Sequence, residues 1–188
     1  MRIISGKHKG RRINPPKKLP VRPTTDLSKE ALFNILNHHV HFGGLNVLDL
    51  FAGTGNMSYE FASRGAENVL SVDVHYPCVQ FIKKTAQEFD MPIVAYKSDV
   101  YKFLEKAKQQ FDLIFADPPY DFTQEKFEEI VNLIFEKKLL EDDGMLIIEH
   151  SDRTSLSHLE NFTAERNYGS TVFSFFELET ETNKSISE

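Results

Sequence analysis

The chain has 188 residues, of which 40% are hydrophobic and 27% are charged, and its net charge is −6. This length and composition are typical of one globular domain with a substantial hydrophobic core. The single cysteine, Cys78, excludes a disulfide or a cysteine-based zinc site within one chain. The sequence has neither an apolar run of about 18 residues nor the apolar core of a signal peptide, so we expect a cytoplasmic protein with no membrane partner.

The charge is distributed unevenly along the chain. Residues 1–30 contain nine Lys or Arg and two Asp or Glu, so they carry +7, whereas the remainder carries −13. This asymmetry is expected of a protein that binds a polyanion through a local surface, and a solvated basic tail fits it equally well. Residues 1–22 contain no acid, and their candidate polyanion contacts are Arg2, Lys7, Lys9, Arg11, Arg12 and Arg22.

The predicted elements start with a short hairpin, with strands at 2–4 and 11–13 around a glycine-containing turn. A proline-rich linker at 15–20 follows, and the polar residues 24–26 then precede a helix at 27–36. From residue 45 onward, strands alternate with helices: strands at 46–50, 68–72, 93–96, 111–116 and 145–149, and helices at 57–64, 76–89, 100–109 and 124–137. This alternation predicts a parallel sheet with crossover helices.

The last predicted elements are strands at 162–166 and 171–178, which flank the turn residues 167–170. The fold class is therefore α/β, with a seven-stranded, mostly parallel sheet that an antiparallel hairpin closes. We divide the chain into a basic hairpin arm at 1–22, one domain at 23–178 and a polar tail at 179–188.

The most informative motif is Asp117-Pro118-Pro119-Tyr120, which follows an apolar strand. Two prolines cannot continue a sheet ladder, so the chain leaves the sheet in a stiff, extended form at the edge where α/β sheets bind ligands. The Asp117 carboxylate and the Pro118 carbonyl can accept hydrogen bonds from an exocyclic amine, and Tyr120 can stack on the base. A plain strand exit, with Asp117 capping the next helix, is the competing interpretation.

A glycine-rich turn, Phe51 to Gly55, joins the strand at 46–50 to the next helix. Gly53 and Gly55 allow the backbone to approach a ligand closely, but the third glycine of the dinucleotide motif is replaced by Ser58. Acids end three strand regions, and each alone fits a helix cap; together they suggest a nucleoside site formed by Asp49, Asp73 and Asp99. The cluster His38, His39 and His41 has no acid or cysteine nearby, so we predict no metal site.

The glycine-rich turn, the three acids and the Asp-Pro-Pro-Tyr motif together resemble the class I S-adenosylmethionine-dependent methyltransferases, whose fold is Rossmann-like. The segments Arg2 to Ile13, Arg22 to Asp26 and Glu30 to Asn34 are similar to the RsmD family in particular. The similarity runs from Arg2 to about Phe176, and the hydrophilic tail departs from it. The family methylates guanine N2 in 16S ribosomal RNA, so the resemblance implies that activity, that cofactor and that partner, within small-subunit ribonucleoprotein particles.

The resemblance also implies roles for individual residues. It assigns the methionine part of the cofactor to Asp49, Phe51, Gly53 and Gly55, the ribose to Asp73, and the adenine to Asp99 with Val100. Val74 is a further predicted cofactor-binding residue. The resemblance assigns the target base to Asp117, Pro118, Pro119 and Tyr120, and it places Arg22 and Thr24 near the RNA path. We expect a monomer.

Two alternatives stay open. The first is an amino-methyltransferase that acts on adenine N6 or cytosine N4 in DNA, or on a protein amide, because the Asp-Pro-Pro-Tyr motif suits any planar amine. The chain has no extra segment large enough to read a DNA sequence, which favours an RNA of defined shape. The second alternative is a non-catalytic RNA-binding assembly factor, and the intact acids argue against it.

Overall fold

The computed structural model describes residues 1–16, 19 and 26–178 of the chain. Its helices are α1 (Asp26–His39), α2 (Asn56–Arg64), α3 (Tyr76–Glu88), α4 (Val100–Lys106) and α5 (Gln124–Glu136). Its strands are β1 (Asn46–Leu50), β2 (Asn68–Asp73), β3 (Ile93–Lys97), β4 (Phe111–Ala116), β5 (Leu140–Ser151), β6 (Phe162–Tyr168) and β7 (Thr171–Glu177). Arg22 and Thr24, two of the predicted site residues, lie outside the described part of the chain.

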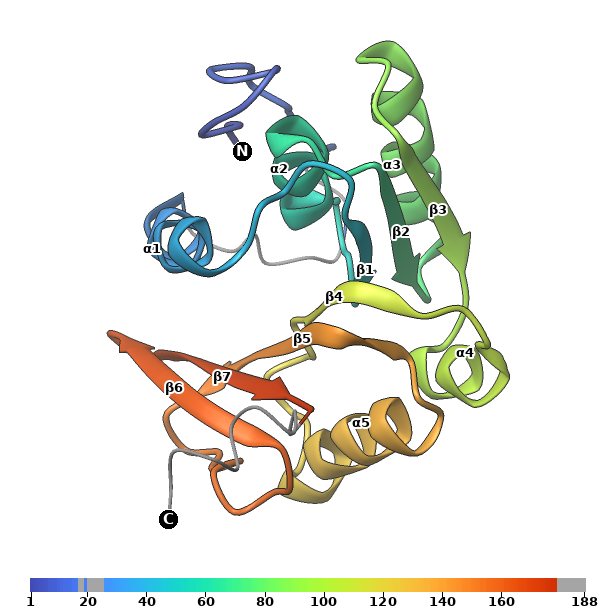
Figure 1. Ribbon diagram of the computed structural model, residues 1–188. Helices are drawn as coiled ribbons and strands as arrows, with labels where there is room; N and C mark the ends of the chain where they lie inside the picture. Colours follow the sequence, from blue (N-terminus) through green and yellow to red (C-terminus); the bar gives the residue numbers. More distant parts are fainter. Residues whose placement is uncertain (17–18, 20–25, 179–188) are drawn as a thin grey trace.

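The strands form one seven-stranded sheet in the order β3-β2-β1-β4-β5-β7-β6 (Figure 1). Strands β1 to β5 run parallel to one another, and β7 runs antiparallel to both β5 and β6. The predicted fold class, with its closing hairpin, is confirmed. The strand order reverses between β1 and β4, and in such sheets a crevice opens at the carboxyl ends of these two strands.

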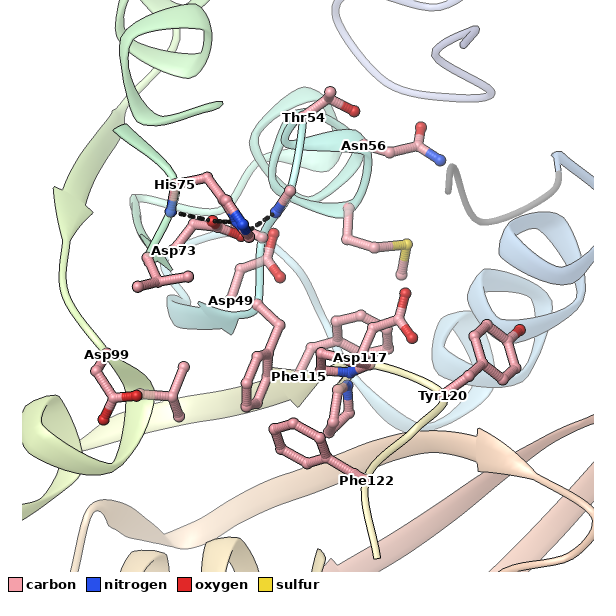
Figure 2. A pocket seen from close by; sticks show the side chains of 18 residues that line it. Asp49, Thr54, Asn56, Asp73, His75, Asp99, Phe115, Asp117, Tyr120 and Phe122 are labelled. Carbon is pink, nitrogen blue, oxygen red and sulfur yellow. Dashed lines mark hydrogen bonds and ion pairs between the residues drawn. The ribbon is translucent and has the colours of Figure 1, made fainter. Parts of the chain in front are cut away.

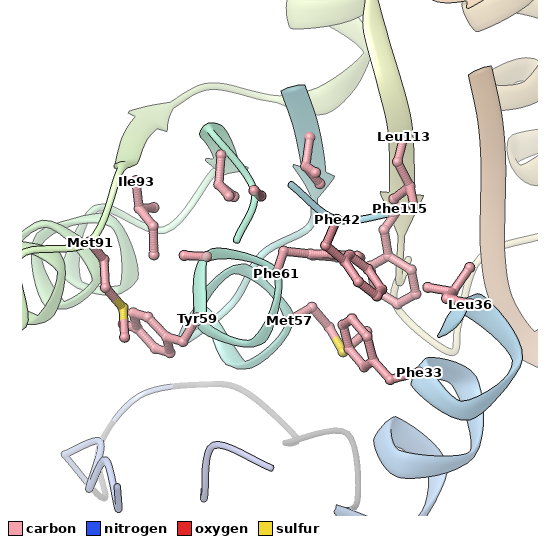
Figure 3. Packing of buried hydrophobic residues seen from close by; sticks show 14 of the residues in the cluster. Phe33, Leu36, Phe42, Met57, Tyr59, Phe61, Met91, Ile93, Leu113 and Phe115 are labelled. Atoms are coloured by element: carbon pink, nitrogen blue, oxygen red, sulfur yellow. The ribbon is translucent and has the colours of Figure 1, made fainter. Parts of the chain in front are cut away.

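Helices cover both faces of the sheet (Figure 1). On one face α1, α2 and α3 pack over a cluster in which the rings of Phe33 and Phe61 meet edge to face, with centroids 4.9 Å apart (Figure 3). On the other face α4 and α5 cover a second cluster that includes Leu104 and Ile130. Cys78 on α3 is a free, fully buried thiol, and burial raises its pKa to about 11.

Some predicted boundaries were wrong. β5 begins at Leu140 and not at residue 145, because Leu140 pairs with Phe111 before a register shift. The residues between Leu140 and Gly144 are exposed acids, so no apolar alternation marks them as strand. α4 ends at Lys106, where the backbone of Ala107 turns extended, so the predicted helix to residue 109 was too long.

The predicted N-terminal hairpin is present: Ile3 N donates to Arg11 O at 2.9 Å and Ile13 N to Met1 O at 3.0 Å, on either side of the bridge between Arg2 and Arg12. The segment is fixed to the domain, because Ile3 and Ile13 are buried in the core cluster. Its turn lies against α2: Lys7 N donates to Ser63 O at 2.7 Å, and a Cβ on Gly6 would meet that same oxygen at 1.8 Å. Only glycine fits so close to another backbone, so this contact depends on residue 6.

Charged side chains are buried where the segment meets the helices. Glu60 on α2 is 0% exposed and accepts hydrogen bonds from Ile4 N at 2.8 Å and Ser5 N at 3.0 Å. Its carboxylate also pairs with Arg64, at 2.8 Å, and with Lys29 of α1, at 3.5 Å. Burial lowers the pKa of Lys29, and Glu60 opposes that shift. We call the group of Lys29, Glu60 and Arg64 the buried ion cluster.

Candidate active site

The turn after β1 forms the floor of the site. Phe51 adopts a φ of 59° and Gly53 a φ of 53°, so the chain reverses tightly between β1 and α2. Phe51, which lacks the freedom of glycine, is held by a T-shaped contact with Phe122 at 5.5 Å between ring centroids. The turn therefore brings its backbone to the carboxyl end of the sheet, where Ala52 N donates to Val72 O and Gly53 N to the Asp73 carboxylate.

Two acids are locked beside this turn. Asp73 at the end of β2 accepts from Gly53 N with one oxygen and from His75 N with the other, each at 2.8 Å. Asp49 on β1 is buried and accepts a short hydrogen bond from Ser58 Oγ, which also contacts Ser71. Burial raises the pKa of Asp49 to about 7, and the Ser58 hydroxyl opposes the shift.

Asp99 occupies the third strand end, with a different local role. Its side chain caps α4 by accepting from Lys102 N at 3.1 Å. The cap interpretation is therefore correct for Asp99 as local structure. Asp99 also lines the same cavity as Asp49 and Asp73, so capping and ligand binding are compatible.

The Asp-Pro-Pro-Tyr segment forms the opposite wall. β4 ends at Ala116, and Asp117 N still donates to Leu50 O, at 3.4 Å, before the prolines leave the sheet. Tyr120 is 60% exposed, which leaves its ring accessible for stacking. The bend is followed by Phe122, whose backbone N donates to Pro119 O at 3.0 Å.

One cavity brings these residues together (Figure 2). Figure 2 shows Asp49 and Asp73 in its middle, with Asp99 at one end and Tyr120 at the other. The predicted residues that line it are Asp49, Phe51, Gly53, Asp73, Val74, Asp99, Val100, Asp117, Pro118, Pro119 and Tyr120. An elongated cavity with acids along one part and a stiff, aromatic-bearing segment at the other suits a nucleoside-type ligand beside a second planar substrate.

Other predicted residues do not line this cavity. Gly55 sits at the N-cap of α2 with a φ of 83°, and a Cβ there would approach Ile82 and Tyr59 at 2.9 Å, so its described role is packing. The basic residues of the N-terminal segment lie outside the cavity, exposed on the surface: Arg2, Lys7, Lys9, Arg11 and Arg12. They remain candidates for contact with a polyanion beyond the pocket.

A comparison with known protein families identifies the family to which the chain belongs. The family model described as "Conserved hypothetical protein 95" matches residues 1–177, nearly the full length. The chain belongs to this family. The resemblance predicted from the sequence is confirmed, since several relatives carry the name ribosomal RNA small subunit methyltransferase D.

Two curated relatives are similar over most of their length. "Putative rRNA methyltransferase YlbH" of Bacillus subtilis is 36% identical over 161 residues, covering 83% of this chain and 85% of that protein. The ribosomal RNA small subunit methyltransferase D of Haemophilus influenzae is 31% identical over 169 residues, covering 87% of this chain and 85% of that one.

A solved structure agrees with the fold of this family member. "Putative methyltransferase yhhF from Escherichia coli" superposes with a TM-score of 0.82 at 25% identity, covering 96% of this chain and 99% of that one. The match spans both the parallel strands and the closing hairpin.

Within residues 1–16, 19 and 26–178, no helix is both long and apolar enough to cross a membrane.

Sequence reasoning missed several lining residues of this family member. His75 contacts Asp73 through Nδ1 at 3.1 Å, and its place two residues after a strand-end acid was the available signal. The other missed residues are Ala52, Thr54, Asn56, Met57, Phe115 and Phe122. Most of them flank the glycine-rich turn, where any side chain is close to a ligand.

His150 on β5 is a buried, hydrogen-bonded residue. It contacts Ser174 Oγ at 2.8 Å and Ser151 O at 2.9 Å. Burial lowers its pKa, which favours the neutral ring. The described residues contain no group of three or more His, Cys, Asp or Glu side chains that could hold a metal ion.

Proposed function

We propose that this protein is an S-adenosylmethionine-dependent methyltransferase of the exocyclic N2 amine of a guanine in small-subunit ribosomal RNA. One observation carries the proposal: the Asp117–Tyr120 wall and the acids of β1 and β2 line a single cavity. The names of the family relatives support the RNA substrate.

The residues present fit the cofactor. The ribose is a diol, and Asp73 is a fixed acceptor because Gly53 N and His75 N hold its carboxylate. Val74 and Val100 offer apolar surface for the adenine, and Asp49 offers negative charge to the positively charged methionine end. When bound, S-adenosylmethionine supplies a methyl group that its sulfonium already activates.

The work of the protein is then to prepare the amine. The nitrogen lone pair of guanine N2 is delocalised into the ring, so the nitrogen is a poor nucleophile. Hydrogen bonds from its N–H groups to the Asp117 carboxylate and the Pro118 carbonyl favour a pyramidal nitrogen and stabilise the positive charge that develops on it. The exposed ring of Tyr120 orients the base by stacking, which is a positioning effect.

The experiment is methyl transfer with radiolabelled S-adenosylmethionine and three macromolecules: small-subunit particles, naked 16S RNA and duplex DNA. We expect label in the particle RNA, and digestion to nucleosides should give N2-methylguanosine. Label on DNA or on protein would contradict the proposed RNA substrate and would identify one of the alternative amines as the methyl acceptor. No label on any of them, together with intact RNA binding, would favour a non-catalytic assembly factor.

A further inference from the structure

A second carboxyl group lies beside the target-amine wall. In the register of β4 and β5, Ala116 pairs with Ile148, so Asp117, directly after β4, comes next to Glu149, which lies within β5. Phe115 and Ile147, two residues earlier on each strand, belong to the same core cluster, so Asp117 and Glu149 share a face of the sheet. A small cavity is lined by Glu149 together with Asp117, Pro118 and Tyr120.

Glu149 is buried and incompletely satisfied. It is only 5% exposed, and among the described residues its Oε2 atom has no hydrogen-bond partner. A buried carboxyl oxygen without a partner costs free energy and is rare in folded proteins. Such a group beside a substrate wall suggests a function that packing alone does not explain.

Two neighbouring carboxyl groups in a shielded site cannot both be ionised without a large cost, so one keeps a proton. Asp117 is half-buried and also lines the larger, open cavity, whereas Glu149 is enclosed. The proton therefore belongs on Glu149 and the charge on Asp117. In agreement, burial and then the charge of Asp117 raise the pKa of Glu149 to about 9.

We propose that Glu149 is a positioning residue of the target-amine site, which stays protonated and donates its O–H to the carboxylate of Asp117. This inference rests on the proposed function. The donated hydrogen bond fixes the orientation of Asp117 and leaves its remaining lone pairs for the amine N–H groups. It also keeps a single negative charge at the place where positive charge develops.

The surroundings of Glu149 offer few competitors for its proton. The titratable side chains that line its small cavity are Asp117 and Tyr120 from the segment after β4, and His150 on the same strand. On the other side, the residue of β7 that pairs with Glu149 is the uncharged Phe173. Burial lowers the pKa of His150, so a positive charge there does not compensate an ionised Glu149.

Two substitutions separate donation from ionisation. Glu149→Gln keeps a donor of the same shape, and we expect kcat within about threefold of the parent at pH 7.5. Glu149→Met keeps the volume but removes the donor, and we expect kcat to fall about 10- to 100-fold with little change in KM for the cofactor. Ile147→Val, on the same face of β5, reports the effect of loosening the strand, and its kcat should stay near the parent value.

The pH profile gives the sharper test. Below its raised pKa Glu149 is neutral and donates; above it the group ionises and repels Asp117. The parent should therefore lose kcat as pH rises through about 9, and Glu149→Gln should not show this loss. If activity instead rises through that range and Glu149→Gln is inactive, Glu149 acts as an ionised base and the proposal fails. Parent-like kcat in Glu149→Met would also overturn it.

A measurement without turnover keeps this inference separate from the proposed function. With its pKa raised from 4.5 to about 9, folded Glu149 holds a proton that the unfolded chain releases, so its contribution to stability is full below pH 4.5 and is lost as pH rises towards 9. The melting temperature of Glu149→Gln minus that of the parent should therefore increase across this window. In an Asp117→Asn background the increase should end at a lower pH.

A difference that does not change with pH would mean that Glu149 is ionised in the folded protein, and it would refute the inference. The expected pH signature in a protein that transfers no methyl group to any RNA would instead overturn the proposed function alone. It would leave the proton-sharing pair of Glu149 and Asp117 supported.

Discussion

The two halves of the cavity are built differently. On the half formed by β1 and β2, each acid is held by groups of the protein itself: Asp73 by Gly53 N and His75 N, and Asp49 by Ser58. The half that follows β4 is an extended proline segment that ends in the exposed ring of Tyr120. The cofactor half is preorganised by these hydrogen bonds, whereas the target half is shaped by two consecutive prolines and carries an aromatic ring that is exposed to solvent.

The two halves should therefore contribute differently to cofactor affinity and to turnover. A preorganised site binds its ligand with little loss of freedom, and it tolerates few changes. The target half instead combines Asp117, which lies beside the buried Glu149, with the exposed ring of Tyr120. Stability, cofactor affinity and turnover should therefore respond to mutations in different parts of the molecule.

The largest expected effect concerns the support of the cofactor half. Glu60→Ala removes the acid of the buried ion cluster and leaves Lys29, which is 1% exposed, with an uncompensated charge. Breaking a buried pair in this way costs about 3–5 kcal/mol of folding free energy. Urea denaturation measures it, and the exposed Glu67→Ala serves as the control, with a change within about 0.5 kcal/mol. A parent-like midpoint for Glu60→Ala would show that the cluster is not needed.

The next effect separates turnover from cofactor binding. Asp117→Ala should lower kcat by about 10- to 150-fold, because a charge-assisted hydrogen bond to the amine is worth about 1.5–3 kcal/mol. Calorimetric affinity for S-adenosylmethionine should stay within a few-fold. Asp121→Ala, an exposed acid four residues later, is the matched control. Normal turnover in Asp117→Ala would contradict the assignment of the target half.

The converse experiment tests the other half. Asp73→Ala should weaken S-adenosylmethionine binding by about 10- to 100-fold through the lost ribose contacts. At saturating cofactor, kcat should recover towards the parent value, because Asp73 does not touch the amine. Unchanged affinity in calorimetry would mean that Asp73 only supports the turn through Gly53 and His75.

A smaller effect follows from the ionisation of Asp49. Burial raises its pKa to about 7, so the carboxyl is largely neutral below that pH and charged above it. The cofactor carries positive charge near Asp49, so its affinity should rise as pH increases from 6 to 8, by about five- to tenfold. Asp49→Asn should bind weakly and with no such pH dependence. Parallel pH profiles for the two proteins would assign the titration to another group.

The smallest effect concerns the basic N-terminal segment. Its deletion would remove Ile3 and Ile13 from the core, so charge is better removed by substitution. The double variant Lys9→Ala and Arg12→Ala should reduce the slope of log K for RNA against log salt by about 1–2, at about 0.7–0.9 per phosphate contact. As the control, Lys106→Ala with Lys108→Ala, two exposed residues at and just after the end of α4, should leave the slope unchanged if the contact surface is local.

Local sequence patterns predicted the helices, the strands and the strand-end acids. Apolar periodicity and prolines that end a strand are signals contained within a few consecutive residues. The docking of the N-terminal segment could not be predicted, since it depends on Gly6 meeting Ser63 across 57 positions of sequence. Glu149 was missed for the same reason: its significance depends on the register that places it beside Asp117. An acid at the end of an apolar strand carries no such signal.

The burial of the Cys78 thiol on α3 has a practical consequence for labelling the protein. Cys78 is fully buried and burial raises its pKa to about 11, so little reactive thiolate exists at neutral pH. A cysteine introduced at an exposed position of the N-terminal segment would then be the only residue that a maleimide dye labels quickly. Single-molecule fluorescence could follow that segment on a ribosomal particle without first removing the native cysteine.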